Sequence, residues 1–146
     1  MQKLKVCPGT LKERRKMTEK TARSVGNLGY HAHIYYDLAT TRGIAERVSS
    51  AIAEKFGVEI DGFRDGPVGP HPIANVLAIF RPEQFAAVVP WLMLNRAGLD
   101  VLVHPLTNDA VADHSNFAIW LGNPVALKTH TLPHGRGGRL PRGISA

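Results

Sequence analysis

The order in which apolar residues change their spacing constrains the fold of this chain more than any other feature. Alternation with a period of two, typical of strands, gives way to helical spacing and returns, so that the patterns follow one another as βαββαβ. The expected strands cover residues 31–36, 58–63, 74–80 and 99–104, and the expected helices cover residues from 40 or 41 to about 56 and from 82 to about 95. This order predicts an α+β fold of the ferredoxin-like type.

A ferredoxin-like sheet places its first strand between the third and the fourth strands, antiparallel to both. The two helices cover one face of this antiparallel sheet. The other face is left open, and such a face is usually closed by a partner. We therefore expect the protein to be a homodimer.

The net charge of +6 is carried by the two ends of the 146-residue chain. Residues 1–29 contain eight basic and two acidic residues, and residues 123–146 contain four basic residues and no acid, whereas the part between them is mildly acidic. Gly, Pro and Arg are frequent near the C-terminus. We predict a flexible basic segment over 1–29, a globular domain over 30–124 and a flexible basic tail over 125–146.

Several functional classes are excluded by the same sequence. No apolar run approaches the roughly 20 residues that span a bilayer, and the basic N-terminus is not followed by the apolar stretch of a signal peptide. Cys7 is the single cysteine and has no partner for an internal disulfide, so we expect a cytoplasmic protein. The chain lacks the aromatic strand signature of RNA-recognition domains, and we do not expect nucleic acid as a partner.

Two histidines stand one residue apart in the first expected strand, in the segment YHAHIYYD. Successive side chains of a strand point to opposite faces. If Ala32 and Ile34 pack under the helices, His31 and His33 project from the open face. A buried strand that carries two imidazoles on one side predicts a functional surface there.

The last expected strand contributes a third histidine to this surface. Val101 and Val103 suit the helix side, which turns His104 to the open face. Because this strand runs antiparallel to the first one, His104 is expected near His31 and His33. Neutral imidazoles bind iron, zinc, copper or nickel, and three protein ligands leave positions open for substrate and oxygen.

Two further histidines are candidates for the same site. His71, in the segment GPHP, precedes the third strand, so it should lie toward the far end of the first strand unless its loop folds back or it reaches the site of a dimer partner. His114 follows the fourth strand and is a candidate ligand, acid/base group or ordinary turn residue. Three carboxylates could complete a site of two histidines and one carboxylate, although turn and strand-entry positions favour structural roles for them: Asp100, Asp109 and Asp113.

Four segments together resemble the Dopa 4,5-dioxygenase family of aromatic ring-cleaving proteins. They are YHAHIYYD, GPHP, FRPEQFAAVVPWLMLNRAGLDVLVHPLTND and DHSNFAIWLG, and the resemblance extends from Tyr30 to about Pro124. It implies a dimeric ferredoxin-like α+β barrel and, for characterised fungal members, extradiol cleavage of a catechol such as L-DOPA with non-haem Fe(II). The family's histidines correspond to His31, His33, His71 and His104.

The leading hypothesis is an extradiol dioxygenase that acts on a catechol and O₂. Its Fe(II) is predicted to be bound by His33, His71 and His104, with His31 as the alternative third ligand. His31 and His114 are the predicted acid/base groups. The alternative hypothesis is a non-catalytic dimeric protein that binds a small aromatic ligand or a metal.

Overall fold

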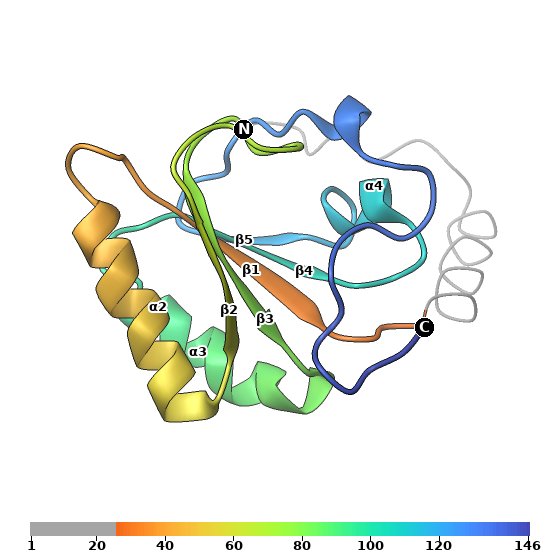
Figure 1. Ribbon diagram of the computed structural model, residues 1–146, viewed down its shortest axis with the longest axis horizontal. Helices are drawn as coiled ribbons and strands as arrows, with labels where there is room; N and C mark the ends of the chain where they lie inside the picture. The colour runs from red at the N-terminus through yellow and green to blue at the C-terminus, as the bar shows by residue number, and fades with distance from the viewer. Residues whose placement is uncertain (1–25) are drawn as a thin grey trace, which may run out of the picture.

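A computed structural model describes residues 26–146 of the chain. Five antiparallel strands form one open sheet in the order β2-β3-β1-β4-β5, and helices pack against it (Figure 1). The strands are β1 Tyr30–Tyr35, β2 Glu59–Arg64, β3 Asn75–Phe80, β4 Val101–Pro105 and β5 Ile119–Leu121. The fold is therefore α+β, as the sequence predicts.

Strand β1 lies in the middle of the sheet between β3 and β4, as expected. The register sets His31 opposite Ile79 of β3 and opposite His104 of β4. The four expected strands are present with ends shifted by one or two residues. Strand β5 was not expected, because three residues at the sheet edge are too few to show a period.

Two helices cover one face of the sheet, α2 (Arg42–Phe56) and α3 (Phe85–Asn95). Gly57 ends α2 in the left-handed conformation, with φ of 69°. The second expected helix starts at Pro82, where the structure has a 3-10 turn, Pro82–Gln84, that leads directly into α3. Alternate residues of β1 pack beneath these helices, so Ala32 and Ile34 are fully buried in the apolar core.

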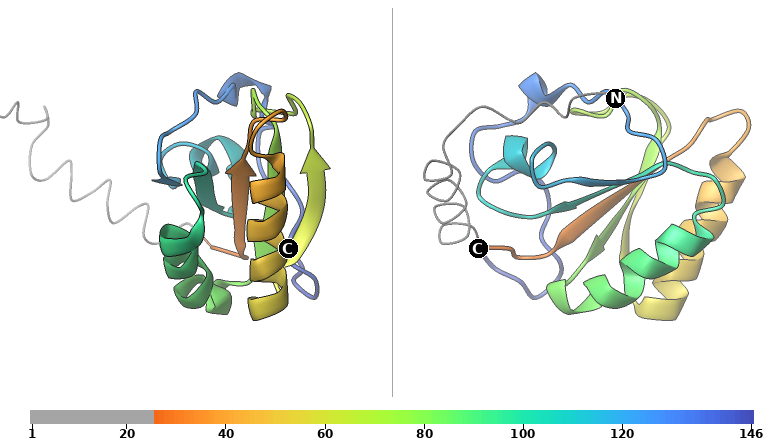
Figure 2. Two further views of the ribbon diagram at one scale, coloured as in Figure 1. Left: turned by 90° about the vertical axis from the view of Figure 1, so that its left-hand side faces the viewer. Right: turned by 180° about the vertical axis from the view of Figure 1, so that it is seen from behind.

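The opposite face carries the short helix α4 (Ala110–Asp113) and the C-terminal segment, as Figure 1 and the right-hand view of Figure 2 show. In the structure, residues 125–146 make backbone hydrogen bonds to the rest of the chain, whereas the sequence predicts a flexible tail. The N–H of Lys128 donates to the carbonyl of Pro70, and the N–H of Ala110 donates to the carbonyl of Gly135, both at 2.8 Å. Part of the face expected to be open is thus covered within the same chain.

The boundaries predicted at residues 29/30 and 124/125 stay a prediction. Most of the basic segment 1–29, including Cys7, lies outside the described residues. Among residues 26–146, no helix combines the length and the apolar character that crossing a membrane requires.

Candidate metal centre

Five histidines converge on the face opposite α2 and α3. Each is at most 8% exposed, and they come from four parts of the chain: His31 and His33 from β1, His71 from the loop before β3, His104 from β4, and His114 from the residue after α4. All five are residues that the sequence marked as candidates. Their convergence makes this face the candidate functional site.

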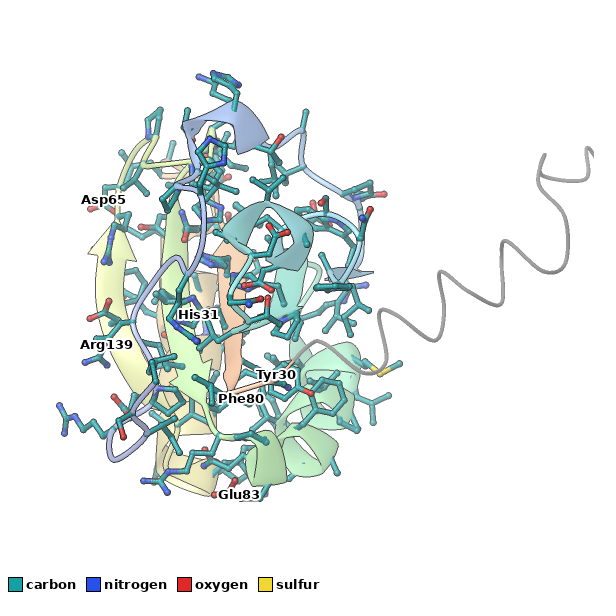
Figure 3. The ribbon with its side chains drawn as sticks, turned by 90° about the vertical axis from the view of Figure 1, so that its right-hand side faces the viewer. Tyr30, His31, Asp65, Phe80, Glu83 and Arg139 are labelled. Atoms are coloured by element: carbon teal, nitrogen blue, oxygen red, sulfur yellow. The ribbon has the colours of Figure 1, made fainter. Side chains whose placement is uncertain are left out.

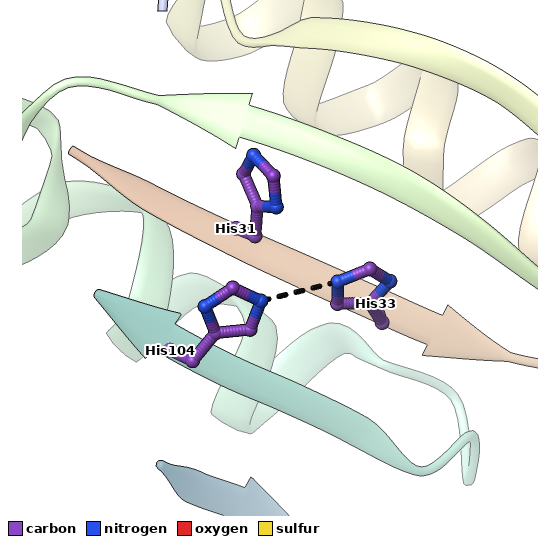
Figure 4. Close-up of side chains that lie close together, drawn as sticks. All are labelled: His31, His33 and His104. Carbon is purple, nitrogen blue, oxygen red and sulfur yellow. Dashed lines mark hydrogen bonds between the residues drawn. The ribbon is translucent and has the colours of Figure 1, made fainter. Parts of the chain in front are cut away.

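Three of the imidazoles come from adjacent antiparallel strands. The register places His31 directly opposite His104, and their ring centroids lie 5.1 Å apart. His33 follows on the same side of β1, with its ring centroid 5.7 Å from that of His31 and 5.3 Å from that of His104 (Figure 4). The alternation of strand side chains and the antiparallel pairing therefore produce the expected contact.

His71 reaches the cluster because its loop folds back. The backbone groups of Val68 and His71 exchange two hydrogen bonds, at 3.0 and 2.9 Å, and this tight turn carries His71 over β1. The ring centroid of His71 lies 3.9 Å from that of His33. His71 thus joins the histidines of its own chain near the C-terminal end of β1, where it contacts both His33 and Tyr35.

His114 is positioned by α4. The side chain of Asp109 caps this helix by accepting a hydrogen bond from the N–H of Ala112, at 3.0 Å. The helix then ends at His114, whose ring centroid lies 4.0 Å from that of His104. His114 therefore packs against His104, and its ring centroid lies 6.1 Å from that of His33 and 5.8 Å from that of His71.

Hydrogen bonds to acceptor oxygens determine which nitrogen of each ring carries the proton. Four imidazoles donate one N–H to an oxygen that has no proton to give: His31 Nε2 to Arg139 O (2.7 Å), His33 Nδ1 to Asn75 Oδ1 (3.0 Å), His104 Nδ1 to Pro105 O (2.8 Å) and His114 Nδ1 to Ala110 O (2.8 Å). A neutral imidazole has a single N–H. The other nitrogen of each of these rings therefore presents a lone pair.

Two of these lone pairs face each other in the interior. His33 Nε2 and His104 Nε2 lie 3.2 Å apart, as the dashed line in Figure 4 marks, and the proton of each ring is on Nδ1. A cation between them removes the repulsion. A metal ion at about 2.0–2.1 Å from each nitrogen, in octahedral or tetrahedral geometry, places the two nitrogens about 2.8–3.4 Å apart. The residues present thus fit a metal ion.

Two compact sets of three histidines offer nitrogens that all lie within 4.8 Å of one another. One set is His31, His33 and His104, and the other is His33, His71 and His114. His33 belongs to both sets, and its Nδ1 is bonded to Asn75. Its single free nitrogen can therefore bind only one ion at a time. The ligand set expected from the sequence takes His71 from one set and His104 from the other.

Burial keeps the cluster uncharged. It lowers the pKa of His31 and of His71 to about 4, and it lowers the pKa values of His33 and His104 well below the usual 6.5. Desolvation is the largest cause, and neighbouring imidazoles add repulsion between the protonated forms. Burial also lowers the pKa of His114. At neutral pH the five rings are uncharged, which is the state that binds metals.

A cavity of about 330 Å³ lies beside the histidines, within the size range of small-molecule sites. Leu77 and Leu132 provide apolar wall, and four of the five clustered histidines line it. Charged side chains also line this cavity: Asp61, Arg64 and Arg139. The histidines therefore have room beside them for a small molecule.

The carboxylates considered at the sequence level have structural partners. Asp109 caps α4, Asp113 accepts hydrogen bonds from the N–H and the hydroxyl of Thr107 (3.1 and 2.5 Å), and Asp100 accepts one from the N–H of Asn123 (2.7 Å). Within residues 26–146, both compact sets consist of histidine alone.

Sequence reasoning missed the residues that orient the imidazoles. Asn75 is buried and holds His33, and the hydroxyl of Tyr35 lies 2.7 Å from His71 Nδ1. A buried asparagine at the start of the apolar strand β3 was a detectable signal, because a polar group there needs a partner. The carbonyl of Arg139, which holds His31, is a backbone group that leaves no trace in the sequence.

The comparison with protein families agrees with this site. A family model described as the Dopa 4,5-dioxygenase family matches residues 30–131, more than half of the chain. The chain belongs to the Dopa 4,5-dioxygenase family. All five clustered histidines of this family member lie inside the matched range.

Two curated fungal proteins are similar to this chain. The chain is 36% identical over 112 residues to an uncharacterized 21.2 kDa protein of Botryotinia fuckeliana, covering 67% of this chain and 60% of that protein. It is 39% identical over 67 residues to the DOPA 4,5-dioxygenase of Amanita muscaria, covering 46% of this chain and 29% of that enzyme. The chain thus spans less than two thirds of the length of these curated relatives.

A solved structure extends the likeness to the fold. It is the crystal structure of a "putative dioxygenase" from Nostoc punctiforme, which is 48% identical and superposes with a TM-score of 0.70. The match covers 72% of this chain and 90% of that one. At this identity, the likeness concerns both fold and family.

Proposed function

We propose that this protein is an extradiol dioxygenase that cleaves the ring of a catechol such as L-DOPA with O₂, using a histidine-bound Fe(II). The single observation that carries the proposal is the pair of imidazole lone pairs, on His33 and His104, that face each other at 3.2 Å inside a buried cluster. Membership of a dioxygenase family supports the reaction type. The ferredoxin-like arrangement of the sheet supplies the face on which this site is built.

We assign the ion to His31, His33 and His104. In this set every ring has its proton committed to an outer oxygen, so each presents a lone pair. In the other set, His71 meets the hydroxyl of Tyr35, which can donate or accept, so no partner commits its proton. Of the two ligands that the sequence left open, His31 is therefore assigned to the ion, and His71 faces the substrate cavity.

Fe(II) bound there would supply a Lewis acid for the catechol hydroxyl groups and a path for electrons from the catechol, which is the reductant, to O₂. The protein's own contribution begins with the substrate. Leu77 and Leu132 offer apolar contact to an aromatic ring, and a bound ring would displace water from beside the histidines. The ring is thereby held against the histidines in a fixed orientation, which supplies part of the rate.

His114 is the proposed acid/base group. Its Nδ1 donates to the carbonyl of Ala110 at 2.8 Å, so its Nε2 is free to accept a proton from a catechol hydroxyl and to return it later. Because burial lowers its pKa, His114 is unprotonated at neutral pH and ready to act as a base. His71 lines the same cavity and is the second group within reach of the substrate.

Oxygen uptake with a panel of catechols tests the proposal. The protein is loaded with Fe(II) under argon, mixed with L-DOPA or simpler catechols, and then exposed to ¹⁸O₂. We expect oxygen consumption and a ring-opened product that contains both labelled oxygen atoms. The variant His130→Ala is the control, because His130 is exposed and lies in neither histidine set.

The opposite result separates the two hypotheses. Iron-loaded protein that binds catechols without consuming oxygen would exclude the dioxygenase and favour the non-catalytic binding protein. Activity that survives both His33→Ala and His104→Ala would exclude the assigned ion site.

A homodimer is a further part of the proposal. Met93 and Leu94, near the end of α3, are 57% and 85% exposed, and such apolar side chains favour contact with another chain. Light scattering is expected to give a mass of about twice the 15.9 kDa of one chain. A mass of one chain at micromolar concentration would exclude the dimer.

A further inference from the structure

We propose that the C-terminal segment is a component of the histidine site, in which the backbone carbonyl of Arg139 positions His31 for ion binding. The proposal deepens the function proposed above and rests on it for the bound ion. In this role Arg139 is a positioning residue, because its carbonyl oxygen accepts a hydrogen bond from the imidazole on the nitrogen that does not face the ion.

The contact determines which nitrogen of His31 faces the cluster. The carbonyl oxygen of Arg139 lies 2.7 Å from His31 Nε2, and a carbonyl can only accept, so Nε2 carries the proton. Figure 4 shows one ring nitrogen of His31 turned toward His33 and His104 and the other turned away from them. The inward nitrogen is therefore Nδ1, with a lone pair. His31 is thus the Nε2–H tautomer, whereas His33 and His104 are Nδ1–H tautomers.

The segment is shaped to lie against this imidazole. Gly138 has φ of +89°, and a Cβ added to it would come within 2.8 Å of His31 Cε1. Only glycine allows the backbone to approach the ring so closely. Figure 3 views the molecule from this side, with His31 beside the part of the segment that carries Arg139. The approach of the chain and the hydrogen bond of Arg139 are therefore parts of one contact.

Glu59, on the edge strand β2, holds the same stretch in place. Its two carboxylate oxygens accept from Arg139 Nη2 at 2.6 Å and from the backbone N–H of Arg142 at 2.7 Å. Glu59 thus anchors the chain on both sides of the carbonyl that meets His31.

The part of the segment that contacts His31 lies outside the residues that the family model matches. That match ends at residue 131, whereas every contact to His31 described above comes from residues 138 and 139. This chain therefore supplies the partner of His31 from beyond the matched domain. An outer oxygen that orients an imidazole ligand typically changes metal affinity by 10- to 100-fold.

Two variants of the full-length protein test the proposal. Gly138→Ala pushes the backbone away from His31, and Glu59→Ala removes the anchor on β2 without touching the cluster. The matched control is Gly135→Ala, since Gly135 also has a positive φ, of +99°, but a Cβ there meets nothing closer than 3.9 Å. Gly138→Ala and Gly135→Ala both place an alanine at a positive φ of similar size. A loss of folding caused by backbone strain alone would therefore affect the control as well.

Two measurements on metal-free and zinc-titrated protein give the answer. In the wild type and in Gly135→Ala, proton NMR should show the Nε2–H of His31 as a slowly exchanging signal. The signal is assigned by its absence from the spectrum of His31→Gln. We expect this signal to disappear in Gly138→Ala and Glu59→Ala, and their Zn²⁺ affinity to fall about 10- to 100-fold. Neither measurement depends on turnover, so a failure of the dioxygenase proposal leaves this test intact.

Three results would overturn the proposal. They are the absence of a protected Nε2–H in the wild type, an unchanged Zn²⁺ affinity in both test variants, and an equal loss of affinity in Gly135→Ala.

Discussion

The two sides of β1 differ although both are buried. On the helix side, Ala32 and Ile34 are 0% exposed and belong to the apolar core. On the other side, His31 and His33 are 3% and 6% exposed, and a cavity of about 330 Å³ lies beside them. Burial alone therefore does not define a core. The first side is filled by side chains that need no partners, whereas the second encloses polar atoms with space beside them.

The apolar residues and the imidazoles of the two sides contribute differently to stability. Burying apolar surface stabilises the fold by roughly 25 cal/mol per Å². Burying an imidazole removes it from water, and the lowered pKa values of His31 and His71, about 4, express this cost for the charged forms. We conclude that apolar burial on the helix side stabilises the sheet, whereas the imidazoles on the histidine side oppose folding when they are protonated.

The largest effect is expected from His33→Ala, which breaks the histidine side alone. His33 belongs to both compact sets, so its loss leaves neither set with three ligands. Zinc titration should show an affinity lower by more than about 100-fold, a loss beyond that of an outer partner. His71→Ala, which leaves the set of His31, His33 and His104 complete, is the comparison. Equal losses of zinc affinity in the two variants would contradict the assignment of His33 as the ligand shared by both sets.

Acidification is expected to have the second largest effect, again through the histidine side. The folded-state pKa values lie below the unfolded value of 6.5, so below pH 6.5 the unfolded state binds protons that the folded state does not. The free energy of unfolding of the metal-free protein should therefore be highest above pH 6.5. It should fall by about 1.4 kcal/mol per pH unit for each such histidine as the pH approaches 4.

Urea unfolding at a series of pH values measures this dependence. His33→Leu should give a shallower slope than the wild type, because one buried imidazole with a lowered pKa is then missing. A free energy of unfolding that is constant between pH 7 and pH 5 would show that the imidazoles are not buried as a neutral cluster.

Phe80→Ala is expected to break the helix side without touching the other. Phe80 is 0% exposed at the end of β3 and belongs to the apolar core, so the substitution should lower the free energy of unfolding by about 3–5 kcal/mol. Zinc affinity of the folded protein should stay unchanged. Leu77→Ala is the matched variant from the same strand: Leu77 lines the cavity, where truncation enlarges existing space, so a smaller loss of stability is expected. A larger loss of stability in Leu77→Ala than in Phe80→Ala would contradict the view that the helix side is the more tightly packed of the two.

The sequence predicts the helix side and the strand histidines well, because both depend on local periodicity. Alternation along β1 and β4 is sufficient to place Ile34 in the core and His31, His33 and His104 on the opposite face. These positions follow once the strand order is known, since antiparallel pairing sets His104 beside His31.

The rest of the site depends on where loops return, which periodicity does not encode. His71 reaches His33 only because the backbone of Val68 pairs with it in a tight turn. The C-terminal segment has the composition of a flexible tail, yet it contacts His31 through a backbone carbonyl, and any residue type would supply the same group. Contacts made by backbone atoms across more than 100 residues leave no pattern in a single sequence.

The smallest of these effects is expected at Asn75. This residue is the first of the apolar strand β3, and its side chain forms a hydrogen bond with His33. Its Oδ1 accepts from His33 Nδ1 at 3.0 Å, and this directs the Nε2 lone pair of His33 toward His104. Asn75→Leu removes the acceptor and should weaken Zn²⁺ binding about 10- to 100-fold. Asn75→Asp keeps an acceptor oxygen in place and should restore binding. If Asn75 had a purely structural role, both variants would bind Zn²⁺ equally weakly, because the carboxylate would then be a buried charge without a function. The difference in Zn²⁺ affinity between the two variants therefore decides whether Asn75 acts through His33.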